Sequence, residues 1–138
     1  MKSYVADTSV AVAWYLPEVF SDTARVWQSR LLDGRVRFVV PGLHYWEFAN
    51  VLRTYVRRGE LDESLSREIW RLHLDAPLDV VEPGVDRVLP LALEYQMTAY
   101  DAVYVALALE LDLPLLTAER SSTPWVKKLG NRVLTVAG

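Results

Sequence analysis

The feature that most constrains this chain is the segment from Thr98 to Asp112, which is apolar almost throughout. Between Ala99 and Leu109 the only ionisable group, apart from two tyrosine phenols, is the carboxyl group of Asp101. Alanine and leucine favour helix, and a helix that is apolar on every face belongs in a protein core. The sequence therefore predicts a buried helix with one carboxylate in its first turn.

Two interpretations of Asp101 follow from this position. In the first, Thr98 caps the helix and Asp101, three residues later, bonds back to the Thr98 amide as part of a capping box. In the second, a carboxylate at the edge of the core is a metal ligand or an acid. Only other carboxylates that reach the same place distinguish the second interpretation from the first.

Composition limits the classes of protein to consider. With 138 residues, we expect a single domain over 1–138 that is long enough to bury a core without disulfides. The absence of cysteine excludes a disulfide framework, a thiolate metal site and a cysteine nucleophile. An acid at position 7 precedes any signal-peptide core, and no apolar run has the length of a membrane span. We expect a cytoplasmic protein with no membrane partner, and a net charge of −3 neither suggests nor excludes a nucleic-acid partner.

Short apolar segments alternate with longer segments of helical periodicity. The strands are expected at 3–6, 36–40, 78–81, 113–116 and 132–136. The helices are expected at 8–15, 21–32 with Ser21 as cap, 43–58, 62–74 with Asp62 as cap, 85–95, from 99 onward, and 121–129. Pro90 should kink its helix or delay its start. This alternation predicts an α/β fold, a three-layer α/β/α sandwich around a mostly parallel five-stranded sheet.

Four acids fall where such a sheet binds ligands, at the carboxyl ends of its strands. Asp7 follows the first strand and Glu119 follows the fourth. Asp101 begins the helix that leads into the fourth strand, so its end of that helix returns to the same edge, and Glu47 lies one turn into the helix after the second strand. Each acid alone could be a cap, a helix-dipole partner or a solvated turn acid. Their common position favours a shared site.

Carboxylates that crowd together repel and raise one another's pKa, so such a cluster predicts a bound cation. A site made only of oxygen ligands suits Mg²⁺ or Mn²⁺, whereas zinc prefers histidine or cysteine. His44 is close enough in sequence to Glu47 to lie near the site, although the oxygen ligands do not require it. His73 is expected on a helix surface.

Four segments match a known family in order and spacing: Val-Ala-Asp-Thr-Ser at 5–9, Glu-Phe-Ala-Asn at 47–50, Thr-Ala-Tyr-Asp-Ala-Val-Tyr-Val-Ala-Leu-Ala at 98–108, and Leu-Thr-Ala-Glu-Arg at 116–120. The third segment is the most specific and the first is weak by itself. The chain resembles the PIN domain along essentially its whole length, and within that family the VapC-like toxin ribonucleases of prokaryotic toxin–antitoxin pairs.

The resemblance implies a PIN-like fold and a Mg²⁺- or Mn²⁺-dependent endoribonuclease that hydrolyses RNA phosphodiester bonds. It implies that Asp7, Glu47 and Asp101 are metal ligands, directly or through water. Glu119 stands where the family usually has aspartate, so its extra methylene could alter a second metal site. The polar neighbours that could orient ligands or waters are Thr8, Asn50 and Thr117.

The resemblance also implies three partners: an RNA substrate, a second copy of the chain in a homodimer, and an antitoxin protein whose tail covers the acidic pocket. The basic residues that could contact phosphates are Arg53, Arg57, Arg58, Arg120, Lys127, Lys128 and Arg132, although each could equally be a solvated charge. The aromatic residues that could stack on bases, or pack in a core or dimer contact, are Trp14, Tyr15, Trp46 and Trp125.

Two other classes were compared with this hypothesis. A receiver domain needs paired acids after its first strand and a lysine after its fifth, and Asp7 stands alone while no lysine follows Lys128. A nucleotide-binding module would have a glycine-rich phosphate loop, which is absent. The remaining alternative is a PIN-like module that binds RNA or protein without cleaving it.

Overall fold

The computed structural model describes residues 1–138 and contains one sheet of five strands in the order β3-β2-β1-β4-β5. The strands are β1 (Lys2–Ala6), β2 (Val36–Val40), β3 (Leu78–Val80), β4 (Leu115–Thr117) and β5 (Val133–Thr135). Every neighbouring pair is parallel, and β1 lies at the centre. The predicted fold class is confirmed, and the sheet is entirely parallel.

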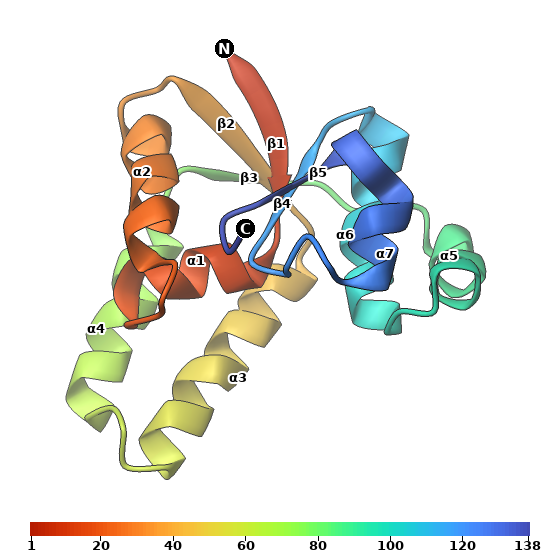
Figure 1. Cartoon of the computed structure of the whole chain (residues 1–138). Helices are drawn as coiled ribbons and strands as arrows, with labels where there is room; N and C mark the ends of the chain where they lie inside the picture. Colours follow the sequence, from red (N-terminus) through yellow and green to blue (C-terminus); the bar gives the residue numbers. More distant parts are fainter.

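Helices cover both faces of this sheet and make three layers (Figure 1). The helices on one side are α1 (Thr8–Tyr15), α2 (Ser21–Leu32), α3 (Leu43–Arg57) and α4 (Glu63–Leu74). Those on the other side are α5 (Val88–Tyr95), α6 (Ala99–Leu111) and α7 (Pro124–Leu129), with short 3₁₀ helices at η1 (Val85–Arg87) and η2 (Gly130–Arg132). None of the helices combines the length and the apolar content that crossing a membrane requires.

The sheet divides the hydrophobic core into two clusters, one on each face, because successive side chains of a strand point to opposite faces. Tyr4 and Phe38 pack in the cluster beneath the first four helices. Val5 and Val39, one residue further along each strand, pack in the cluster beneath the other three. The second halves of these two strands, residues 4–6 and 38–40, are therefore buried on both faces, which explains why they are continuously apolar in sequence.

The predicted core helix is α6, and it is buried from Ala102 to Ala108 except at Val103. Thr98 caps it: the Thr98 hydroxyl accepts a hydrogen bond from the Asp101 amide at 3.1 Å. The helix ends where Asp112 adopts a left-handed backbone conformation. Local sequence and tertiary burial agree in this element, so its expected position is confirmed.

The delayed helix start that was one alternative for Pro90 is confirmed, and two other local expectations need correction. Residues 85–87 form a 3₁₀ turn and the α-helix starts only at Val88, so Pro90 falls in the first turn, where a missing N–H costs no intrahelical bond. Ser21 does not cap α2: its hydroxyl accepts from the Glu18 amide and donates to the Leu16 carbonyl, which orders the preceding loop instead. The last α-helix starts at Pro124 rather than at 121.

The burial of α6 predicts how truncation affects stability. Leu107 has no exposed surface, whereas Leu32, at the end of α2, is 64% exposed. Leu107→Ala should lower the free energy of unfolding by about 2–5 kcal/mol, because it removes apolar contacts and leaves a cavity. Leu32→Ala should change it by less than about 1 kcal/mol. Urea denaturation of both variants measures the difference, and equal effects would contradict the assignment of α6 to the core.

Candidate functional site

Asp7 stands where β1 ends and α1 begins. Its carboxylate caps α1 by accepting from the Ser9 amide at 3.4 Å, and the Thr117 hydroxyl donates to its other oxygen at 2.9 Å. Thr117 ends β4, which pairs with β1, so parallel pairing places both residues at the same edge of the sheet. The cap does not enclose Asp7, because its side chain still lines an open pocket.

Glu47 reaches the same edge from α3. Its Oε1 accepts hydrogen bonds from the Thr8 hydroxyl at 2.9 Å and from the Tyr104 hydroxyl at 2.7 Å. Both donors are buried, so the orientation of the carboxylate is fixed from the core side. The sequence patterns do not single out Tyr104, although it follows Asp101 by three residues and so lies on the same side of α6.

Asp101 and Glu119 complete the set of predicted acids. The Asp101 carboxylate makes no hydrogen bond to the Thr98 amide, so only half of a capping box is present at the start of α6. The Glu119 carboxylate accepts from the Thr123 hydroxyl at 3.3 Å, and the Glu119 amide donates to the Thr117 hydroxyl oxygen at 3.1 Å. Thr117 therefore connects the loop of Glu119 to Asp7.

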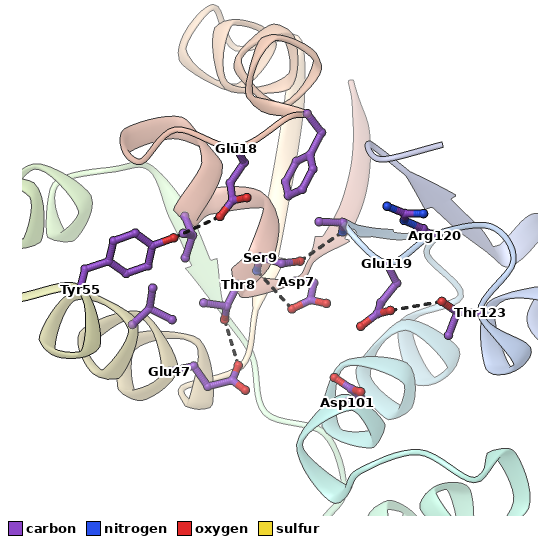
Figure 2. A pocket seen from close by; sticks show the side chains of 14 residues that line it. Asp7, Thr8, Ser9, Glu18, Glu47, Tyr55, Asp101, Glu119, Arg120 and Thr123 are labelled. Atoms are coloured by element: carbon purple, nitrogen blue, oxygen red, sulfur yellow. Dashed lines mark hydrogen bonds between the residues drawn. The ribbon is translucent and has the colours of Figure 1, made fainter. Parts of the chain in front are cut away.

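The four acids line one pocket of about 630 Å³ and lie around its opening (Figure 2). Four polar residues that the sequence analysis did not assign to the site line it as well: Ser9, Glu18, Tyr55 and Thr123. The Tyr55 hydroxyl donates to Glu18 at 3.2 Å. The sequence gives no signal for Glu18, because this residue lies in the loop after α1, where there is no helical periodicity, and does not follow a strand.

Burial and like charge both act on the carboxylates. Burial raises the pKa of Asp7 from 3.8 to about 7; the Thr117 hydrogen bond opposes this shift, and the charges of Asp101 and Glu47 add to it. Burial and the nearby charge of Glu119 raise the pKa of Asp101. Burial also raises the pKa of the Tyr104 phenol, which therefore remains a hydrogen-bond donor at neutral pH. The acids affect one another electrostatically, as expected of a shared site.

The oxygen atoms that line the pocket are potential ligands of a divalent cation. The side chains facing the pocket offer carboxylate and hydroxyl oxygens, which suit Mg²⁺ or Mn²⁺, and no cysteine or imidazole ligand. As the side chains stand, no three of the aspartate, glutamate or histidine groups are arranged to hold a metal ion. The chemistry of the donors fits, and the carboxylates would have to move closer to share one ion.

Three polar residues that the sequence analysis considered do not line the pocket: Asn50, His44 and His73. Asn50 is exposed on α3 and does not line the pocket. His73 was expected on a helix surface, and this is wrong: it has no exposed area, because α4 turns that face onto the core. His44 is equally buried, and its Nδ1 lies 3.2 Å from the Thr8 hydroxyl rather than facing the pocket.

The basic candidates are spread over the surface, and the aromatic candidates are divided between the core and the surface. Arg120 is the only basic residue that lines the acidic pocket. The arginines at 53, 57 and 58 line a separate hollow of about 310 Å³ on α3, and Arg132 pairs with Asp112 at 3.6 Å. Trp14 and Trp125 are buried in the core, whereas Trp46 is 74% exposed.

The sequence of this chain is similar to one known domain family and to known ribonucleases. The sequence description of the PIN domain matches residues 4–121. Ribonuclease VapC3 of Pyrobaculum aerophilum is 32% identical over 120 residues, which cover 84% of this chain and 88% of that protein. Ribonuclease VapC1 of Mycobacterium tuberculosis is 39% identical over 69 residues, which cover 46% of this chain and 52% of that protein.

Two solved structures have the same fold. PAE2754 from Pyrobaculum aerophilum superposes with a TM-score of 0.74 at 22% identity, over 96% of this chain and 83% of that one. A chain of a toxin–antitoxin complex from Klebsiella pneumoniae superposes with a TM-score of 0.59 at 14% identity, over 96% and 97% of the two chains. At these identities the likeness establishes the architecture alone.

The raised pKa of Asp7 predicts a pH-dependent stability of the metal-free protein. Because this pKa rises from 3.8 to about 7 on folding, the folded state keeps a proton that the unfolded chain has released, and this advantage is lost as pH rises through about 7. In Asp7→Asn the side chain at position 7 is uncharged at every pH, so this variant does not lose that stability as pH rises. Its melting temperature relative to wild type should therefore be higher at about pH 8 than at about pH 5.5, measured by circular dichroism in EDTA. A difference that is constant with pH would contradict the burial of this charge.

Proposed function

Because this chain belongs to the PIN-domain family, we propose that it is a Mg²⁺- or Mn²⁺-dependent endoribonuclease. The observation that carries the proposal is the pocket formed by Asp7, Glu47, Asp101 and Glu119, which come from four separate parts of the chain. Acids that only cap helices would have no reason to face one another across a cavity. A shared cation gives a reason, because it offsets the repulsion between them.

The residues divide into ligands and groups that orient them. Asp7, Glu47 and Asp101 would hold the cation, with Glu119 as a fourth oxygen donor. Thr8 and Tyr104 fix the Glu47 carboxylate, and the Thr117 hydroxyl fixes that of Asp7. When bound, the cation would offset the charge of the phosphate and lower the pKa of a water for attack on the phosphodiester.

The substrate proposal depends on positive charge beside the acids. Arg120 lines the pocket and can contact the phosphate that is cut. The arginines at 53, 57 and 58 on α3 lie outside it, where they can contact phosphates further along the strand. RNA affinity should then weaken as salt rises, because phosphate contacts release counterions.

We also propose that the protein is the toxin of a toxin–antitoxin pair and forms a homodimer. The toxin assignment is supported by relatives named Ribonuclease VapC and by a structural neighbour described as a toxin–antitoxin complex. Support for a second copy comes from Val85, Leu89 and Leu93, which recur every four residues and are 86%, 64% and 71% exposed. An apolar row of this kind favours an interface.

The direct test is cleavage of a panel of structured RNAs. With Mg²⁺ or Mn²⁺ present the wild type should cut, and EDTA should abolish cutting. Asp7→Asn and Asp101→Asn should each reduce the rate at least about 100-fold, because each removes charge that would hold the cation.

Asp22→Asn is the matched control, because it makes the same chemical change on the exposed surface of α2, with a fully exposed carboxylate. It should cut as well as wild type. If EDTA and the pocket variants leave the products unchanged across the panel, the proposed catalysis is wrong, and a module that binds RNA or protein without cleavage becomes the better interpretation.

A further inference from the structure

Two buried histidines that the proposed reaction does not use lie in the core behind the site. His44 is in the first turn of α3 and His73 in the last turn of α4, and neither has any exposed surface. Their Nε2 atoms are 2.7 Å apart. Two lone pairs or two N–H groups cannot face each other at this distance, so one proton lies between the rings.

This pair belongs to a longer series of hydrogen bonds. On one side, His73 Nδ1 lies 3.1 Å from the Tyr15 hydroxyl. On the other, His44 Nδ1 lies 3.2 Å from the Thr8 hydroxyl, which lies 2.9 Å from Glu47 Oε1. We call these five side chains the Tyr15–Glu47 chain. It leads from the partly exposed Tyr15, through the core, to a carboxylate of the acidic pocket.

Both rings are neutral near neutral pH. Burial, and then the neighbouring ring, lower the pKa of His44 to about 3, and burial lowers the pKa of His73 to about 4. A neutral imidazole has one donor and one acceptor nitrogen. Once the direction of the Nε2–Nε2 bond is chosen, the role of every other nitrogen is therefore fixed, and the Tyr15–Glu47 chain has only two possible polarities.

In the outward polarity, the Thr8 hydroxyl donates to His44 and cannot donate to Glu47. In the inward polarity, His73 Nε2–H donates to His44, His44 Nδ1–H donates to Thr8, and Thr8 donates to the carboxylate. A carboxylate is the stronger acceptor for the single Thr8 proton. The Tyr104 hydroxyl lies 2.6 Å from Thr8 and 2.7 Å from Glu47, and its single proton is donated to Glu47. The inward polarity therefore gives Glu47 Oε1 two donors, Thr8 and Tyr104, whereas the outward polarity leaves it with the Tyr104 proton alone.

We propose that His44 and His73 are positioning residues, which direct the Thr8 hydroxyl proton toward Glu47 and so hold that carboxylate in its orientation at the acidic pocket. Neither ring is free to bind a metal, because both nitrogens of each are engaged in hydrogen bonds. The effect on catalysis rests on the proposed function. The proton arrangement does not, and it can be measured without RNA.

The first measurement is the tautomeric state of the histidines in ¹⁵N-labelled protein without a histidine tag, by NMR at about pH 7. The chain has only two histidines, so assignment is direct. We expect His44 with its proton on Nδ1 and His73 with its proton on Nε2. The reverse pair of tautomers, or a charged ring, would overturn the proposal whatever the nuclease assay shows.

The second measurement compares two replacements of His73. His73→Phe keeps an aromatic ring that can stack on Phe48, whose ring centroid is 4.0 Å away, but removes the donor to His44. His73→Gln keeps a donor where Nε2 was. His73→Phe should lose the single His44 tautomer and lower kcat for RNA about 10-fold with KM unchanged, and His73→Gln should recover most of both.

Thr8→Val tests the inner end of the Tyr15–Glu47 chain, because it removes the hydroxyl with almost no change of shape. It should lower kcat by a similar factor. Trp70→Phe is the packing control: Trp70 also stacks on Phe48 but makes no polar link to the pair. It should leave kcat and both tautomers as in wild type. If His73→Phe keeps the His44 tautomer and kcat, or if Trp70→Phe lowers kcat equally, the positioning role is wrong and the histidines only fill the core.

Discussion

Parallel pairing of β1 with β4 is the constraint on which the rest of the structure depends. The register that places Val5 beside Leu115 and Ala6 beside Leu116 brings the ends of these two strands together. Asp7 and Thr117, which are 110 positions apart, thereby come within hydrogen-bond distance. Since β1 is the central strand, every helix that contributes an acid is placed relative to this edge.

The acidic pocket is costly to fold in the absence of a cation. Asp7 is desolvated and faces other negative charges, so its proton is held to a pH far above the usual range of an aspartate. Hydroxyl groups of Thr117, Thr8 and Tyr104 offset part of this cost by donating to the carboxylates. Functional sites commonly keep charged groups that lower the stability of the fold. The repulsion between these groups is offset when a ligand binds.

Most of the fold could be predicted because local signals and burial agree. The alternation of short apolar segments with helical periodicity was sufficient for five parallel strands, and Asp62 does cap its helix, accepting from the Leu65 amide at 3.3 Å. The lining of the pocket by four acids follows from the rule that parallel strands present ligands at their carboxyl ends. Their roles as metal ligands stay a prediction.

What could not be predicted depends on contacts between distant elements. In the sequence, Tyr104 is one of many hydrophobic residues of a buried helix. Its role becomes visible only in the structure, where α3 places Glu47 within hydrogen-bond distance of its hydroxyl. Glu18 lies in a loop, and only the fold turns it toward the pocket. The periodicity of α4 shows an amphipathic helix, yet a histidine at position 73 is equally compatible with either face until His44 provides a partner in the core.

The central claim is that these carboxylates form one divalent-cation site. Calorimetric titration of Mn²⁺ into wild type, Asp101→Asn and Asp22→Asn tests it most directly, because binding is measured without a substrate. The account predicts saturable binding to wild type and Asp22→Asn, and at least about 10-fold weaker binding to Asp101→Asn, because a charged oxygen donor is lost. No saturable binding to wild type, or equal binding to all three proteins, would contradict it.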